Sequence, residues 1–162
     1  MKIGYLGAGT WGYCLGSLLA SKGYEVIMWT KEEELVKELQ KTRKHPLFPK
    51  QEAPETLRFT HNIEDTIKDV DAIVEGVSSA GIRPVFEMLK SLQVPMLPII
   101  LTSKGIEQNT SLLLTDLVIE ILGEKYRKQI GCLSGPSHAE EVIMNIPSSV
   151  CCSAYENDIL LF

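Results

Sequence analysis

The sequence lacks the features of several protein classes. Its 162 residues include only four cysteines, with no C-x-x-C spacing, so neither a disulfide framework nor a metal site is expected, and a cytoplasmic location is favoured. No apolar run approaches the roughly 20 residues needed to span a bilayer, and the N-terminus does not have the pattern of a signal peptide. The net charge of −5 argues against nucleic acid or an anionic membrane as a partner.

A glycine-rich loop stands near the N-terminus. The residues Gly7-Ala8-Gly9-Thr10-Trp11-Gly12 form a G-x-G-x-x-G pattern between an apolar run and a segment with leucines at helical spacing. Between a strand and a helix, this pattern predicts a dinucleotide site. Gly7 would permit the tight turn, Gly9 would let a pyrophosphate approach the backbone, and Gly12 would let the helix pack closely on the strand. A tight turn without a ligand is the alternative interpretation.

Strands and helices alternate along the chain. Apolar runs predict strands at 3–6, 24–29, 58–60, 72–77, 97–103, 130–133 and 148–154, and amphipathic spacing predicts helices at 13–22, 32–41, 63–70, 82–92, 111–122 and 136–144. This alternation predicts an α/β protein of the Rossmann type, with a doubly wound, mainly parallel sheet and helices on both faces. Cys151 and Cys152 fall in the last predicted strand and are expected to lie in the core.

The end of the second predicted strand bears on the choice of cofactor. NAD-selective sites usually carry an acidic residue there, which binds the ribose hydroxyls. This chain has Thr30 instead, followed by Lys31, whose charge would suit a 2′-phosphate, and the acidic Glu32 comes too late. The sequence therefore predicts that NADP is accepted or preferred and that NAD is tolerated.

Two further loops follow the fifth and sixth predicted strands. Lys104 would offer a cation to a phosphate or a polarised oxygen, although a solvated loop lysine is the plain alternative. After the sixth strand, Gly135 exposes backbone and Ser137 offers a hydroxyl at the start of a helix, although a plain strand–helix turn would look the same. Because neighbouring parallel strands end at one edge of the sheet, these loops and the glycine loop are expected to lie together.

These motifs occur together in one known family. The chain resembles the N-terminal half of the NAD(P)-dependent glycerol-3-phosphate dehydrogenases, and most of all their bacterial, chlamydia-like branch. The stretch Ser134-Gly135-Pro136-Ser137 with its Ala139-Glu140-Glu141 tail is the most specific feature, because dinucleotide-binding folds in general do not carry it. The other matching stretches are the glycine loop, Leu47-Phe48-Pro49, Ser103-Lys104-Gly105 and Pro147-Ser148-Ser149-Val150.

The resemblance implies a function and a set of site residues. The function is hydride transfer between NAD(P)H and dihydroxyacetone phosphate, which gives sn-glycerol 3-phosphate for glycerophospholipid synthesis. Besides the glycines, the cofactor would contact Thr10, Trp11, Lys31, Lys104 and Ala139, and the substrate would contact Lys104, Gly135 and Ser137. The family's proton-transferring lysine lies in a C-terminal helical domain. No catalytic residue is therefore expected in residues 1–162, and this chain alone is expected to turn over little or nothing.

The resemblance also divides the chain. Residues 1–155 are expected to form the NAD(P)-binding domain, and residues 156–162 the start of a helix that leads to an absent C-terminal domain, because Ile159-Leu160-Leu161-Phe162 is apolar throughout. Two alternative functions stay open. One is a standalone NAD(P)-sensing module whose apolar end docks on a partner, and the other is a dehydrogenase of the 6-phosphogluconate or ketopantoate-reductase type. Homodimerisation is also left open.

Four residues depart from the family pattern. Lys44 replaces an asparagine of the cofactor loop, which weakens the case for a contact there, and Ser78 replaces a proline. Glu75 replaces an aliphatic residue in a central strand, where a carboxylate needs a partner or an exposed position. His138 replaces a phenylalanine and is expected to be packed or half-exposed rather than catalytic.

Overall fold

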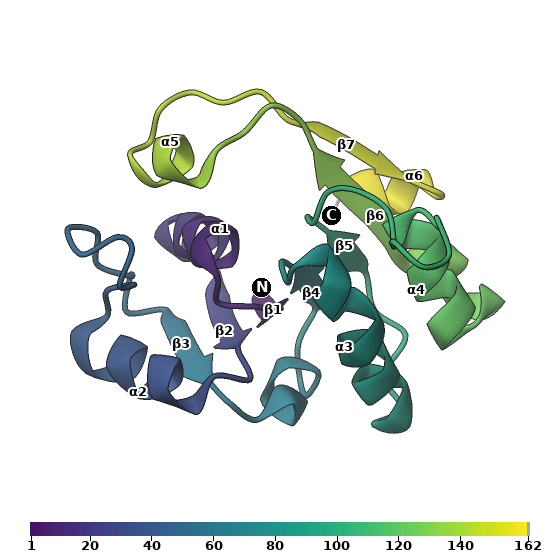
Figure 1. Ribbon diagram of the computed structural model, residues 1–162, viewed down its shortest axis with the longest axis horizontal. Coiled ribbons are helices and arrows are strands. Elements are labelled where there is room, and N and C mark those ends of the chain that lie inside the picture. The colour runs from purple at the N-terminus through teal and green to yellow at the C-terminus, as the bar shows by residue number, and fades with distance from the viewer. Residues whose placement is uncertain (162) are drawn as a thin grey trace.

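A seven-stranded sheet runs through the computed structural model of the protein, which describes residues 1–161 (Figure 1). The strands are β1 (Lys2–Leu6), β2 (Glu25–Trp29), β3 (Leu57–Thr60), β4 (Ala72–Glu75), β5 (Ile99–Leu101), β6 (Ile130–Ser134) and β7 (Cys151–Ala154). The helices are α1 (Thr10–Ser21), α2 (Glu33–Thr42), α3 (Ser79–Ser91), α4 (Leu114–Leu122), α5 (Ala139–Ile143) and α6 (Asn157–Leu160), with 3₁₀ helices η1 (Ile63–Thr66) and η2 (Glu124–Gln129). Phe162, the last residue of the apolar end noted above, lies outside the described residues. Within residues 1–161, no helix combines the length and the apolar character that crossing a membrane requires.

The strand order is that of a doubly wound sheet. It runs β3-β2-β1-β4-β5-β6-β7, so the direction in which the chain adds strands reverses between β1 and β4. Strands β1 to β6 are parallel to their neighbours, and β7 pairs antiparallel with β6, with Gly131 opposite Ala154. This confirms the predicted Rossmann-type, mainly parallel sheet. It also places the switch point beyond the ends of β1 and β4, where such sheets bind ligands.

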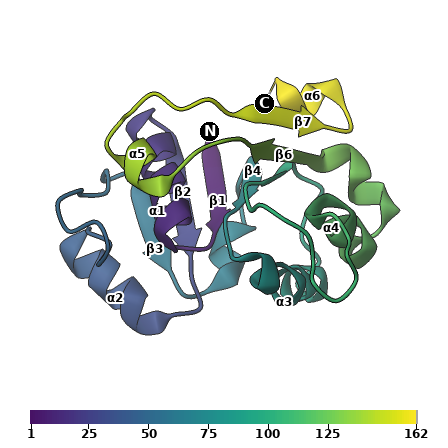
Figure 2. The same ribbon diagram turned by 45° about the horizontal axis from the view of Figure 1, so that its top comes forward.

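Helices cover both faces of the sheet, as predicted (Figure 2). On one face, α3 and α4 pack on a core that includes Leu6, Ile73 and Ile99. On the other face, α1, α2 and α5 surround a second core that includes Tyr5 and Met28. Because the central strands are buried from both sides, nearly all their residues can be apolar. Both views show α5 beside α1, although more than a hundred residues separate them in sequence.

Three helices are shorter than predicted. The predicted helix 63–70 is only the 3₁₀ turn η1, although the side chain of Asn62 caps it as expected, accepting from the Glu64 N–H at 3.3 Å. The predicted helix 136–144 is reduced to α5, because Gly135 (φ 146°) and the extended His138 lead the chain along the sheet edge before the helix begins. The predicted helix 111–122 begins only at Leu114, because Ser111 has a left-handed φ of 59° and Leu113 is extended.

The prediction that Cys151 and Cys152 lie in the core is wrong, because both side chains are exposed. The reason is the place of β7, which is an edge strand and pairs only with β6. The other edge strand, β3, is packed against α2 and buries Leu57 and Phe59, whereas β7 contacts mainly β6 and the short helix α6. The apolar run correctly predicted a strand but did not reveal its place in the sheet.

Candidate functional site

The glycine loop joins β1 to α1 with the geometry that its pattern predicts. Gly7 has a φ of 102°, a left-handed conformation that suits glycine. A Cβ on Gly12 would lie 2.2 Å from the carbonyl oxygen of Gly7, so the helix starts directly against the loop. A Cβ on Gly9 would meet nothing within 4 Å. The first and third glycines are therefore required by the fold, and the second leaves open space at the N-terminal end of α1.

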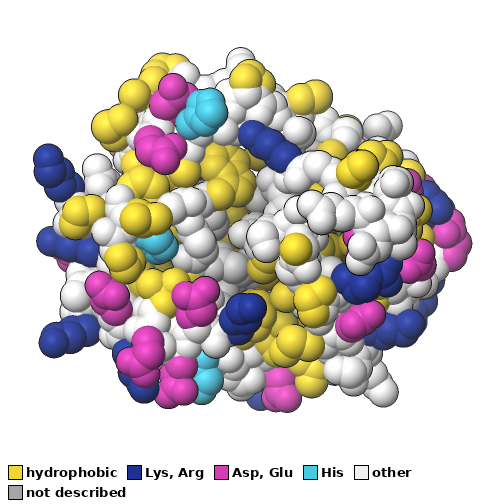
Figure 3. Space-filling model, in the orientation of Figure 1, with side chains coloured by type: hydrophobic (Ala, Val, Ile, Leu, Met, Phe, Trp, Pro, Cys, Tyr) yellow, Lys and Arg dark blue, Asp and Glu magenta, His cyan; other side chains and the backbone are white. Residues whose placement is uncertain are grey.

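A cleft of about 530 Å³ opens beside this loop. Figure 3 shows a hollow in the surface between the part that carries α1 and α5 and the part that carries α3 and α4. Of the predicted site residues, the cleft brings together Gly9, Thr10, Trp11, Lys104, Ser137 and Ala139. Gly7, Gly12, Lys31 and Gly135 do not line it. The expectation that the three loops meet at one edge of the sheet is confirmed.

Sequence reasoning did not predict the other residues of the cleft wall as cofactor- or substrate-binding residues. They directly follow β4 and β5 or flank Ala139, and the rule that ligands lie beyond the carboxyl ends of strands beside the switch point is the signal that finds most of them. These residues are Gly76, Val77, Ser78, Ser79, Thr102, Ser103, His138 and Glu140. His138 is exposed, which excludes a packed side chain but agrees with a half-exposed one.

Lys104 connects the loops that border the cleft. Its ammonium nitrogen Nζ donates to the carbonyl oxygen of Gly135 at 2.7 Å, and it lies 3.2 Å from Oγ and 3.3 Å from the carbonyl oxygen of Ser137. The same atom stands 5.5 Å from the centre of the Trp11 ring, whose Nε1 donates to Oγ1 of Thr102 at 3.2 Å. The lysine is thus a positioned cation rather than a freely solvated one, and its charge favours an anion in the cleft.

The buried thiol of Cys14 holds the part of the cleft wall that carries Ser137 and Ala139. Sγ of Cys14, in α1, donates to the carbonyl oxygen of Ala139 at 2.8 Å. Burial raises the pKa of this thiol to about 12, so it stays a protonated donor at neutral pH. Ala139 is itself buried, and its backbone is therefore held against α1. The thiol links the glycine-loop helix to the segment that carries Ser137.

Glu75 finds the partners that a carboxyl in a central strand needs. It is fully buried at the end of β4. Its Oε1 accepts from the Val77 N–H at 2.6 Å and lies 2.7 Å from Oγ of Ser103. Burial raises the pKa of this carboxyl to about 7, and the hydrogen bonds from Ser103 and Val77 oppose that rise. The carboxyl therefore changes charge near neutral pH directly behind the cleft.

The residues that bear on cofactor choice lie after β2. Thr30 is buried, and its Oγ1 accepts from the N–H of Glu32 at 3.3 Å, so it closes the turn into α2. Lys31 is exposed and stands outside the cleft. Since β2 is parallel to β1 and beside it, both strands end at the same edge of the sheet.

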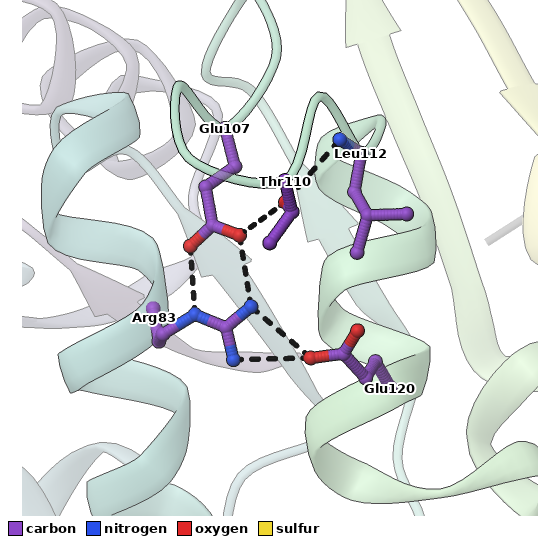
Figure 4. Close-up of polar contacts among 5 residues, drawn as sticks. All are labelled: Arg83, Glu107, Thr110, Leu112 and Glu120. Atoms are coloured by element: carbon purple, nitrogen blue, oxygen red, sulfur yellow. Dashed lines mark hydrogen bonds and ion pairs between the residues drawn. The ribbon is translucent and has the colours of Figure 1, made fainter.

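An ion-pair cluster holds the loop that follows Lys104 (Figure 4). Arg83, in α3, binds Glu107 with two parallel bonds, from Nε at 2.7 Å and from Nη2 at 2.8 Å, and it also contacts Glu120 in α4 at 3.1 Å. Glu107 in turn accepts from Thr110. The guanidinium holds the pKa of Glu107 down, at about 2. The cluster therefore fastens the loop to both helices on this face.

We predict that replacing Arg83 with methionine loosens this loop. Without the bidentate contact, Glu107 loses its cation, and amide hydrogen exchange in residues 105–112 should become severalfold faster. The matched control is Arg127→Met, which removes an exposed pair with Glu124 three residues away and should leave exchange in this loop unchanged. Equal exchange rates in the R83M and unmodified chains would contradict a fastening role for the cluster.

Comparison with known proteins identifies the family. Residues 2–160 match the family model described as NAD-dependent glycerol-3-phosphate dehydrogenase N-terminus. The chain belongs to this family. It is 53% identical over 159 residues to a glycerol-3-phosphate dehydrogenase [NAD(P)+] of Protochlamydia amoebophila, a match that covers 98% of this chain and 48% of that protein. The enzyme of the same name from Chlamydia pneumoniae is 50% identical, with 98% and 47% covered.

Solved structures of glycerol-3-phosphate dehydrogenases share the fold. The crystal structure of the enzyme from Coxiella burnetii superposes with a TM-score of 0.89 at 30% identity, covering 99% of this chain and 48% of that one. The enzyme from Saccharomyces cerevisiae superposes with a TM-score of 0.83 at 24% identity, covering 99% and 52%. The chain thus spans about half the length of the curated relatives it matches. The resemblance to the chlamydia-like branch of the family, which the sequence motifs predicted, is confirmed.

Proposed function

We propose that this chain is the cofactor-binding half of an NAD(P)-dependent sn-glycerol-3-phosphate dehydrogenase. The whole enzyme would transfer hydride between NAD(P)H and dihydroxyacetone phosphate in the cytoplasm, giving glycerol 3-phosphate for glycerophospholipid synthesis. One observation carries the proposal. A glycine loop with open space over Gly9 faces Lys104, which is bound to Gly135 and Ser137, across one cleft.

The residues of the glycine loop fit a dinucleotide. The open space over Gly9 would admit a pyrophosphate, and the first N–H groups and positive dipole end of α1 point toward it. Thr10, Trp11 and Ala139 would border the cofactor, with Lys31 near the adenosine ribose. The bound cofactor would supply the hydride. The chain's own part is to hold the cofactor and to exclude water from that side of the cleft.

The second half of the proposed site serves the substrate. Lys104 has three donors, and in the cleft they now meet oxygens of Gly135 and Ser137. A phosphate or carbonyl oxygen of the substrate would replace one of these partners, and the Ser137 hydroxyl would be free to bind it as well. We place the proton-transferring lysine in the further half of the longer relatives, so it would lie outside this chain.

Cofactor binding is tested by the substitution Gly9→Ala. Since its Cβ would meet nothing within 4 Å and Gly9 has a φ of −68°, the fold should accept alanine with no loss of melting temperature. A pyrophosphate on the loop would clash with that methyl group, so NADH affinity should fall by about tenfold or more. Titration of NADH fluorescence measures the affinity, and an unchanged affinity in the stable variant would contradict the proposal.

Cofactor choice is tested at Lys31. Removing its charge in Lys31→Ser should weaken NADPH binding by about fivefold, because an exposed charge pair contributes up to roughly 1 kcal/mol, and it should leave NADH binding unchanged. Lys22→Ser is the control, since it removes the same charge from the opposite end of α1. If the unmodified chain bound NADH ten or more times more tightly than NADPH, the predicted acceptance of NADP would be wrong.

A further inference from the structure

Glu75 stands behind the cleft without touching its interior. It ends β4, between Leu6 of β1 and Leu101 of β5, and these two neighbours are at most 1% exposed. It does not line the cleft. Both groups that its carboxyl binds, Val77 and Ser103, do line the cleft. The carboxyl therefore joins the turn after β4 to the loop after β5, two neighbouring parts of the cleft wall on the same side of the switch point.

The contacts around this carboxyl need one proton more than the neighbours provide. Oγ of Ser103 lies 2.7 Å from Oε1 of Glu75 and is also in hydrogen-bonding contact with the carbonyl oxygen of Val77. Each of these oxygen–oxygen contacts requires a proton, and a serine hydroxyl has only one. If the hydroxyl donates to Val77, the proton between Ser103 and Glu75 must come from the carboxyl. With Glu75 protonated, both contacts of the Ser103 hydroxyl have a proton.

Ionisation of Glu75 would change this arrangement. The hydroxyl of Ser103 would turn to the carboxylate, because a charged acceptor binds a donor more strongly than a neutral one does. The carbonyl of Val77 would then face an oxygen with no proton between them and would have to move away. A negative charge would also appear behind a cleft whose proposed ligand is anionic. Both effects disfavour binding.

We propose that Glu75 is a positioning residue for the cofactor: its protonated form holds Val77 and Ser103 in the binding arrangement, and its ionisation weakens binding. The inference rests on the proposed function, because it assumes that the cofactor occupies this cleft. The link extends to the opposite wall, since Oγ1 of Thr102 donates to the carbonyl oxygen of Glu75 at 2.7 Å and accepts from Trp11. Glu75 is thus tied to the cleft wall twice, through its carboxyl to Val77 and Ser103 and through its backbone carbonyl to Thr102.

Behind the cleft, Glu75 is a group whose charge changes near neutral pH. On β1, burial raises the pKa of Tyr5 far above the working range. On the side of the sheet that α3 covers, Arg83 is paired with Glu107 of the loop after Lys104, and the pKa of Glu107 lies at about 2. Lys104 lies beyond β5 at the mouth of the cleft. Burial raises the pKa of Glu75 itself to about 7, within the range of a titration experiment.

The first test needs no ligand. The backbone amide signals of Val77 and Ser103 in ¹⁵N–¹H NMR spectra should shift together between pH 5.5 and 9, with a midpoint near 7. Glu75→Gln keeps the size of the side chain and should abolish the shift, whereas Ser103→Ala removes a donor to the carboxylate and should move the midpoint to higher pH. A flat profile in the unmodified chain, or the same midpoint in E75Q, would overturn the proposal.

The second test measures cofactor affinity against pH with NADH, which has no phosphate that titrates near neutrality. Affinity in the unmodified chain should fall about fivefold between pH 6 and 8.5, and in E75Q it should not depend on pH. His138 also lines the cleft, so the control His138→Gln must keep the pH dependence. A pH-independent affinity in the unmodified chain would overturn this inference alone. Failure to bind NADH or NADPH at any pH would instead contradict the proposed function.

Discussion

Replacing Gly12 with alanine is expected to lower the free energy of unfolding by about 3 kcal/mol or more. The new Cβ would stand 2.2 Å from the carbonyl oxygen of Gly7 and 3.3 Å from the Tyr5 ring. The first of these is backbone in a tight turn, and Tyr5 is fully buried, so neither can move without disturbing the core. Urea denaturation followed by circular dichroism measures the effect.

The sign of this effect makes the prediction specific. Gly12 lies inside α1, and glycine to alanine within a helix ordinarily stabilises by about 1 kcal/mol. A loss of stability therefore reports the close approach of helix and loop rather than helix propensity. Gly9→Ala is the matched control, since its Cβ meets nothing within 4 Å. If G12A unfolded at the same urea concentration as the unmodified chain, the close packing at Gly12 would be wrong.

Replacing Glu75 with glutamine is expected to stabilise the chain at pH 8 by about 2 to 3 kcal/mol. Burial raises the pKa of this carboxyl from 4.5 to about 7, so the folded chain favours the protonated form. The contribution of Glu75 to stability is fully present below pH 4.5 and is lost as the pH rises through 7. The uncharged glutamine avoids that loss. Melting temperatures of the two chains should therefore diverge between pH 4.5 and 7 and run parallel above that.

Glu107 provides a control of opposite sign. Its pKa is lowered to about 2 by hydrogen bonds from Arg83, so its contribution to stability is present at neutral pH and is lost only on strong acidification. Glu107→Gln should therefore lower the melting temperature at pH 8, where Glu75→Gln raises it. An E75Q chain that melted with the unmodified chain at both pH 5 and pH 8 would contradict the raised pKa of Glu75.

The fold could be predicted from the sequence because its signals are local. Apolar residues such as Ala72, Ile73 and Val74 are buried in the sheet, and the glycine at position 12 is required by its contact with Gly7, within one turn. What failed depends on distant parts of the chain. The exposure of Cys151 and Cys152 follows from the outermost place of β7, which no residue of that strand encodes.

The candidate site was predicted in outline for the same reason. The rule that parallel strands end at one edge correctly brought Lys104 and Ser137 to the glycine loop. The partners of Glu75 could not be named, because Ser103 and Val77 reach it from two separate turns whose conformations are set by packing. The contact of Arg83 with Glu107 joins residues 24 positions apart and likewise left no local pattern.

The antiparallel direction of β7 decides where the chain goes after the sheet. Ser134, at the cleft end of β6, pairs with Cys151, and Gly131 pairs with Ala154, so β7 carries the chain away from the cleft. Its four residues cover about 13 Å at roughly 3.3 Å each. The helix α6 that follows accordingly lies at the far end of the sheet, where Ile159 packs beside Gly131 near the start of β6.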